Sequence, residues 1–334
     1  MNKTDKIYVA GHSGLVGSAI IRLLHSDGYL NIIVRTHKEL DLLDQKAVFA
    51  FFETEKPEHV FFAAGKVGGI GAHINYPADF IYQNVIMGFN IIQAAHGFKV
   101  KKLINLSAGA VYPRLVEQPI KEETVLTGPL EPTTEAYAIA KLSVIKLCSS
   151  YNKQYGTNFM SVLPCNIYGP GDKYDIENSS VLPAMIRKFH EARITGRNEV
   201  TLMGDGSPCR EFLYSEDLAN MLIFFMANKN AVDLRNTMGD FISVGSGKDV
   251  TIKELAEIIR NVVYEKEFHA SGNLSPTEIC RINWDTSKPN GMPRRLLDTS
   301  RLSALGCKAT TELSEGIKKA YADFLGRQEP KVLC

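Results

Sequence analysis

The chain has 334 residues, 45% of them hydrophobic, and its 38 lysines and arginines nearly balance 37 aspartates and glutamates. Such a chain is long enough for one large domain and a smaller lobe, and the balanced charge argues against general nucleic-acid binding. The six cysteines are scattered, and we find neither a signal-peptide pattern nor an apolar run near the roughly 20 residues of a membrane span. We therefore expect a soluble, cytoplasmic protein with reduced thiols that does not contact a membrane.

Short apolar runs alternate with longer segments of helical periodicity in the first half of the chain. We expect strands at 6–10, 31–35, 59–63, 102–106 and 158–163, and helices at 15–27, 44–54, 78–98 and 135–154. This alternation predicts an α/β protein with a Rossmann-type doubly wound parallel sheet. Ligands of such sheets bind at the carboxyl ends of the strands.

After Pro164 the alternation becomes less regular. We expect a turn at 168–172, a helix from about 180 to 192, strands at 200–202 and 241–244, and a loop at 291–295. A further helix is expected at 251–264, with Asp249 as its candidate N-cap. The predicted domains are a Rossmann domain of residues 1–170 plus about 211–247, and a smaller C-terminal α/β substrate lobe of residues 171–210 and 248–330.

A glycine-rich run separates the first expected strand from the first helix. It reads Gly11-His12-Ser13-Gly14-Leu15-Val16-Gly17. At this position the backbone N–H groups of a helix N-terminus bind the pyrophosphate of a dinucleotide. The run alone is a weak signal, because it occurs in many dinucleotide-binding proteins.

The end of the second expected strand indicates which dinucleotide binds. Proteins that bind NAD carry an acidic residue about 20 residues past the glycines, where it binds the ribose 2′-hydroxyl. Here the strand ends in Arg35, followed by His37 and Lys38. A basic cluster favours the 2′-phosphate of NADP(H), with Arg35 as its first candidate ligand. The alternative is that Arg35 is only a solvent-exposed residue at the end of a strand.

Tyr137 and Lys141 form the second informative motif. Residues four apart lie on the same face of a helix, and an ammonium near a phenol lowers the phenol pKa and makes it a usable acid. Together with the glycine run, this pair predicts hydride transfer to or from a nicotinamide, with Tyr137 handling the proton.

These residues resemble the extended short-chain dehydrogenase/reductase family, and within it the GDP-fucose synthases, which are GDP-4-keto-6-deoxymannose epimerase-reductases. The resemblance covers nearly the whole chain. The most specific markers are Lys66-Val67-Gly68-Gly69-Ile70 and Ser287-Lys288-Pro289-Asn290-Gly291-Met292-Pro293-Arg294. Others are the segments 76–84, 130–132, 166–170 and 210–213.

The resemblance implies a role for individual residues. Tyr137 is the expected general acid at C4 of the sugar and Lys141 its support. The expected NADP(H) ligands are Gly11, Ser13, Gly14, Leu15, Val16, Gly17, Arg35, Asp41, Leu42, Ala63, Ala64, Lys66, Tyr137, Lys141, Pro164 and Asn166. The expected ligands of the nucleotide diphosphate-sugar are Asn166, Arg187, Arg210 and Lys288. The resemblance also implies a homodimer in which the helices at 78–98 and 135–154 form a paired bundle.

The sequence departs from the family at both groups that perform epimerisation. The family's cysteine falls on Ala110 and its histidine on Ser180. Epimerisation at C3 and C5 needs a base that removes a proton and an acid that returns one to the other face. Alanine can do neither, and an unactivated serine is a poor substitute. His190 is a weak candidate replacement, and we expect Cys165 to pack as a small apolar residue.

A further departure affects the reacting carbonyl. The hydroxyl residue that usually binds it falls on Ala108, and losing one such donor costs about 2.7–4 kcal/mol of transition-state stabilisation. Ser107 is our first candidate for the missing hydroxyl, and Thr133 or Thr134 the second. A third interpretation is that Ala108 is an engineered change.

We therefore predict NADPH-dependent C4 reduction of a GDP-linked 4-keto-6-deoxy sugar, hexose or heptose, without epimerisation at C3 or C5. The alternatives are a bifunctional 3,5-epimerase/4-reductase and a non-catalytic NADP-binding regulatory protein. A 4,6-dehydratase is disfavoured because Ala108 and Gly109 occupy the position of its acidic pair. A C4 epimerase is compatible with the fold, but would return its cofactor unchanged.

Overall fold

A computed structural model describes residues 1–176, 179–271, 276–288, 290 and 292–328. Its largest sheet has the strand order β2-β1-β3-β4-β5-β10-β9 and is parallel except for the antiparallel pair β9–β10. The strands are β1 (Ile7–Ala10), β2 (Ile32–Ile33), β3 (His59–Phe62), β4 (Lys102–Leu106), β5 (Phe159–Pro164), β9 (Arg235–Asn236) and β10 (Gly239–Val244). Because β2 and β3 flank β1, the topological switch point lies at the carboxyl ends of β1 and β3.

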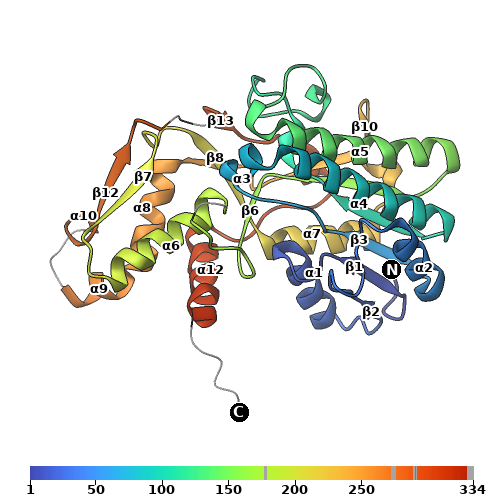
Figure 1. Cartoon of the computed structure of the whole chain (residues 1–334), viewed down its shortest axis with the longest axis horizontal. Helices are drawn as coiled ribbons and strands as arrows, with labels where there is room; N and C mark the ends of the chain where they lie inside the picture. The colour runs from blue at the N-terminus through green and yellow to red at the C-terminus, as the bar shows by residue number, and fades with distance from the viewer. Residues whose placement is uncertain (177–178, 272–275, 289, 291, 329–334) are drawn as a thin grey trace, which may run out of the picture.

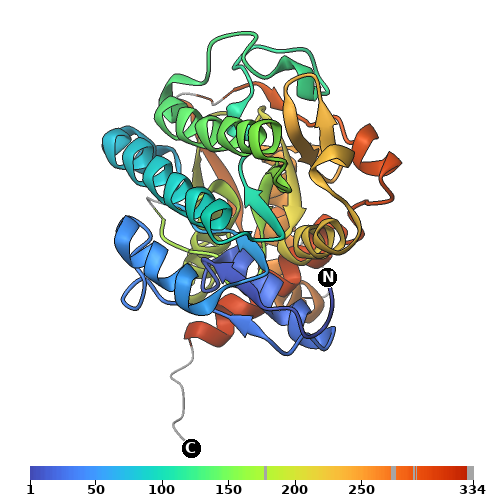
Figure 2. The ribbon, with the colours of Figure 1, turned by 90° about the vertical axis from the view of Figure 1, so that its right-hand side faces the viewer.

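Helices cover both faces of this sheet (Figures 1 and 2). On one face lie α1 (Leu15–Ser26) and α7 (Ser215–Asn228), and on the other α2 (Gln45–Glu55), α4 (Pro77–Gly97) and α5 (Glu135–Tyr155). Alternate strand residues point to opposite faces of the sheet. Ile7 and Val9 are buried against α1 and α7, whereas Tyr8 and Val60 are buried against α2 and α4. The predicted Rossmann-type doubly wound fold is confirmed.

A second group of elements lies beside this sheet, at the left of Figure 1. One sheet has the order β11-β8-β13, with β6 also pairing with β8, and β7 pairs with β12. The strands are β6 (Asn166–Tyr168), β7 (Glu199–Met203), β8 (Cys209–Tyr214), β11 (Asp249–Thr251), β12 (Arg281–Asp285) and β13 (Arg294–Arg295). The helices are α6 (Val181–Ile194), α8 (Ile252–Val263), α9 (Glu265–Ser271), α10 (Pro276–Ile279) and α12 (Leu313–Gln328), whereas α11 (Ser300–Ala304) packs against the core of the large sheet.

A separate apolar core holds this second group together. Phe189 of α6, Ile259 of α8 and Phe324 of α12 are buried in it. The domain boundaries expected from the sequence stay a prediction. Within the described residues, no helix is both long and apolar enough to span a bilayer.

Most expected elements are present, with some local corrections. The expected strand at 31–35 is only two residues long, and the expected loop at 291–295 contains β13, while its Gly291 lies outside the described residues. Thr251, not Asp249, is the N-cap of α8, because its side chain accepts a hydrogen bond from the backbone N–H of Glu254. Asp249 instead belongs to β11 and pairs with Arg294.

Several elements were not expected from the sequence, among them β8, α7, β12 and α12. Strand β8 carries the charged pair Arg210-Glu211 at its start, which hides its apolar pattern. Glu211 is fully buried, and its carboxylate accepts hydrogen bonds from the backbone N–H groups of Gly247 and Leu297. A buried carboxylate satisfied in this way is a structural anchor that no local pattern predicts.

Candidate active site

The glycine run forms a tight turn between β1 and α1. Gly11 has φ +82°, and a Cβ at Gly17 would lie 2.1 Å from the carbonyl oxygen of Gly11, so both positions require glycine. Gly14 is the N-cap of α1, and no acidic side chain lies in the first turn of the helix. The backbone can therefore approach a pyrophosphate, and the helix N-terminus is free to bind an anion.

The residues after β3 lie against this turn. A Cβ on Gly11 would be 2.7 Å from the Cα of Ala64, so the two segments touch, and Ala63 precedes Ala64 at the end of β3. Lys66 follows, and its Nζ lies 2.8 Å from Asp79 of α4. The glycine run and the segment 63–66 therefore form one continuous wall at the switch point. Ser13 belongs to the turn, Leu15 begins α1, and Val16 is buried in the core.

Arg35 lies beyond this wall and is already paired. Its guanidinium lies 2.5 Å from Glu55 Oε1 and donates to the carbonyl of Val34 at 2.8 Å. A cofactor phosphate would share Arg35 with Glu55. Asp41 accepts a hydrogen bond from the N–H of Leu43 and is partly exposed, and Leu42 is a buried core residue.

Tyr137 and Lys141 lie one turn apart on α5, and both are buried. The Nζ of Lys141 is 5.8 Å from the centre of the Tyr137 ring and donates to the carbonyl of Leu106 at 2.9 Å. Burial lowers the pKa of Lys141 to about 8 and raises the pKa of Tyr137. Burial of the phenol sets the direction of this shift, and a pKa-lowering contribution of Lys141 to Tyr137 stays a prediction. A phenol with a raised pKa stays protonated at neutral pH, as a proton donor must.

The segment after β4 faces Tyr137 with small apolar side chains. Ala108 and Ala110 pack against the buried cluster of Ala72, Phe80 and Tyr137. A methyl group thus stands where a hydroxyl or thiol would face the phenol. Ser107 is buried and its hydroxyl has no hydrogen-bond partner, which leaves it available as the replacement expected from the sequence.

His73 is a residue that the sequence reasoning missed. It lies on the short helix α3 (Ile70–Asn75) and is buried. Its ring centre is 5.2 Å from that of Tyr137 and 4.1 Å from that of Phe80. The available signal was a single histidine in the glycine-rich segment that follows β3, at the sheet edge where ligands bind.

Two arginines lie together at the edge of the second sheet. Arg210 of β8 and Arg295 of β13 are Cα partners, so their side chains share one face. Arg295 donates to the carbonyl of Tyr112 at 3.4 Å, which places it beside the segment that carries Ala108 and Ala110. Burial, with the nearby charge of Arg210, lowers the pKa of Arg295 to about 10. Arg295 was not predicted as a site residue.

The other predicted substrate residues are more dispersed. Asn166 is held on β6 by a hydrogen bond from its amide to the carbonyl of Glu211 at 2.9 Å. Arg187 of α6 pairs with Glu191 at 2.8 Å. Lys288 is exposed after β12, which belongs to a different sheet from that of Arg210. Pro164 ends β5, and a Cβ on Gly109 would lie 3.2 Å from its carbonyl oxygen, which places it under the Ala108 segment.

The candidate replacements for the epimerisation groups are not arranged for that chemistry. His190 lies 3.0 Å from the hydroxyl of Tyr321 on α12 and packs against Phe324, so it joins two helices. Ser180 is an exposed N-cap of α6. Burial raises the pKa of Cys165 well above its usual value, which keeps this thiol protonated.

Comparison with known proteins now identifies the family. Residues 7–238 match the NAD dependent epimerase/dehydratase family. The chain belongs to this family. It is 46% identical to the GDP-L-fucose synthase of Escherichia coli, over 97% of this chain and 98% of that protein.

Two solved structures from Campylobacter jejuni are also close. One is a GDP-6-OMe-4-keto-L-xylo-heptose reductase, with a TM-score of 0.89 and 34% identity over 98% of this chain and 99% of that one. The other is a GDP-mannoheptose C4 reductase with NADP bound, with a TM-score of 0.85 and 36% identity over 97% and 99%. The expected family and oxidoreductase class are confirmed, while the roles of individual residues stay predictions.

Proposed function

We propose that this protein is an NADPH-dependent reductase that converts the C4 ketone of a GDP-linked 4-keto-6-deoxy sugar to an alcohol without epimerising C3 or C5. One observation carries the proposal: Ala110 packs against the Tyr137 cluster where the related epimerases place an acid/base group. The phenol needed for reduction is retained, while the groups needed to exchange the protons at C3 and C5 are absent from their usual positions.

The residues present fit the cofactor. The glycine turn lets a pyrophosphate approach the backbone at the N-terminus of α1. Arg35 is the cation expected from the sequence to bind the 2′-phosphate. When bound, the nicotinamide supplies the hydride to C4 of the sugar. Two solved neighbours with NADP bound support the choice of NADP(H).

In this proposal Tyr137 donates its proton to the C4 oxygen as that oxygen gains negative charge. Lys141 is held by Leu106 in position to stabilise the phenolate that Tyr137 becomes. Arg210 and Arg295, which share one face of the second sheet, bind the diphosphate. Asn166, which begins β6 two residues after the end of β5, orients the substrate.

Either a hexose or a heptose fits this proposal. The relatives include GDP-L-fucose synthases, and the solved neighbours include reductases of GDP-heptoses. NADPH oxidation measured with both classes of keto sugar distinguishes them. We expect clear turnover with at least one, and no turnover with either would contradict the proposal.

The rival from another class is a protein that binds NADP without catalysis. The substitution Tyr137→Phe separates the two, because a reductase loses its proton donor while its cofactor site is unchanged. We expect turnover to fall by about 100-fold or more, with the Kd for NADPH unchanged. A Tyr137→Phe protein with wild-type turnover would contradict the assigned role.

We also propose that the protein is a cytoplasmic homodimer built around α4 and α5. The exposed faces of these helices carry large apolar side chains, among them Tyr82 and Phe89 on α4 and Ile139 on α5. Apolar side chains gathered on neighbouring helices are typical of a protein–protein interface.

A further inference from the structure

His73 is the one histidine in ring contact with Tyr137 in the part of the chain that the structure describes. The imidazole is buried on α3 between Phe80 and Tyr137, with ring centres 4.1 Å and 5.2 Å away. Helix α3 follows the Lys66 segment at the carboxyl end of β3. The imidazole is therefore held where the topology of the sheet places the ligand.

Tyr137 lies in an apolar cluster, and Ser107, next in sequence to Ala108, is the candidate hydroxyl beside it. Ala108 and Ala110 approach the same cluster with methyl groups, and Lys141 is committed to the carbonyl of Leu106. A keto sugar carries a carbonyl and hydroxyl groups, and each loses hydrogen bonds to water when it is buried. A site without polar partners for these groups binds such a sugar poorly.

We propose that His73 is a substrate-contacting residue of the reduction, whose imidazole gives the sugar next to the C4 ketone the hydrogen bond that Ala108 and Ala110 cannot give. This inference rests on the proposed reductase function. The ring contacts with Phe80 and Tyr137 hold the imidazole in place, and a neutral imidazole offers one N–H donor and one acceptor nitrogen to a ligand. Burial lowers the pKa of His73, so the ring is neutral at pH 7 and accepts a hydrogen bond from a sugar hydroxyl.

The test compares two substitutions with a matched control. His73→Phe keeps a flat ring between Phe80 and Tyr137 but removes both nitrogens, and His73→Asn keeps a small hydrogen-bonding group. His25→Phe makes the same chemical change on the exposed end of α1. Each protein is assayed for NADPH oxidation with GDP-4-keto-6-deoxymannose in heavy water, with the Kd for NADPH and the unfolding temperature measured alongside.

We expect His73→Phe to lower kcat/KM by at least about tenfold, with the Kd for NADPH and the unfolding temperature near those of the wild type. His73→Asn should retain more activity than His73→Phe, and His25→Phe should match the wild type. Adding Ala108→Ser to the His73→Phe protein should restore part of the loss, because it returns a hydroxyl to the same side of Tyr137.

Two results would overturn the inference about His73, and a different result would contradict the proposed function. Wild-type kcat/KM in His73→Phe would show that the imidazole does not contact the substrate, with the reductase proposal intact. If His73→Phe stopped deuterium entry at C3 or C5 but left reduction unchanged, His73 would be an epimerisation base instead. Deuterium at C3 or C5 with the wild-type protein would contradict the proposed reductase-only function itself.

Discussion

The Nζ of Lys141 donates a hydrogen bond of 2.9 Å to the carbonyl oxygen of Leu106, the last residue of β4. This contact anchors a buried ammonium at the carboxyl edge of the sheet, one helical turn from Tyr137. Burial lowers the pKa of Lys141 from 10.5 to about 8. Keeping Lys141 charged in this buried position therefore costs free energy of folding.

This shift predicts a pH-dependent effect on stability. Between about pH 8 and 10.5 the unfolded chain binds more protons at Lys141 than the folded chain does, so rising pH favours folding at this residue. We expect Lys141→Met to be inactive, and at pH 7 to have an unfolding temperature at or above that of the wild type. The difference between the two proteins should narrow as the pH rises towards 10. A difference that does not change with pH would contradict the assigned pKa.

The position of Arg295 beside Arg210 predicts that substituting Arg295 weakens substrate binding selectively. Arg295→Met should raise KM for the GDP-sugar by about tenfold or more, because a charge-assisted hydrogen bond to the diphosphate is lost. The Kd for NADPH should not change, since Arg295 is distant in sequence and sheet from the glycine run.

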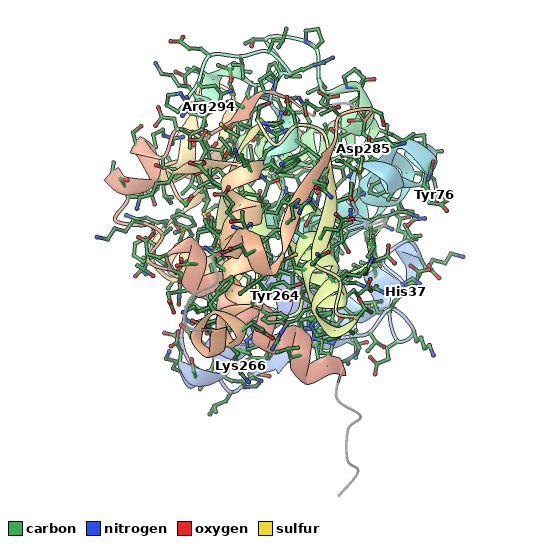
Figure 3. The ribbon with its side chains drawn as sticks, turned by 90° about the vertical axis from the view of Figure 1, so that its left-hand side faces the viewer. His37, Tyr76, Tyr264, Lys266, Asp285 and Arg294 are labelled. Carbon is green, nitrogen blue, oxygen red and sulfur yellow. The ribbon has the colours of Figure 1, made fainter. Side chains whose placement is uncertain are left out.

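The neighbouring arginine is a matched control. Arg294, labelled in Figure 3, lies on the same strand but is paired with Asp249 at 2.6 Å and is exposed. Because Arg294 is exposed and already paired with Asp249, Arg294→Met should leave KM nearly unchanged. An equal effect of the two substitutions would contradict a specific role for Arg295.

The close approach of Gly17 to Gly11 predicts that Gly17 does not tolerate a larger residue. A Cβ at Gly17 would lie 2.1 Å from a backbone oxygen, so Gly17→Ala must displace the turn. We expect a loss of about 1–3 kcal/mol in the free energy of unfolding and much weaker NADPH binding. Gly97→Ala on α4 introduces the same methyl group where nothing lies within 4 Å, and urea unfolding should show little change for it. Equal stability of the two variants would contradict the geometry of the turn.

The exposed apolar face of α4 predicts the oligomeric state. Tyr82 and Phe89 are seven residues apart, so they lie on one face of the helix, and they are 62% and 38% exposed. We expect the wild type to elute as a dimer in size-exclusion chromatography with light scattering, and Tyr82→Lys combined with Phe89→Lys to shift it to the monomer. A monomeric wild-type protein would exclude the proposed dimer.

The sequence predicts the parallel sheet well because its strands are continuous apolar runs separated by periodic helices, and two motifs place the cofactor and the proton donor. It cannot predict pairings between distant segments. Arg35 was predicted as a ligand of the 2′-phosphate, and its ion pair with Glu55 of α2 could not be predicted. His73 and Arg295 become site residues only because α3 and β13 bring them to Tyr137 and Arg210. A spacing of four residues also does not show that Tyr137 is buried, and burial raises the pKa of its phenol.

The central claim is reduction without epimerisation, and isotope exchange tests it most directly. The wild-type protein is incubated with NADPH and GDP-4-keto-6-deoxymannose in heavy water, and the product is examined by NMR. A base that removes the protons at C3 or C5 would replace them with deuterium from the solvent. We predict stoichiometric NADPH oxidation and a product that carries only hydrogen at C3 and C5. Deuterium at either carbon would contradict the claim and show that another acid/base group in this site performs epimerisation.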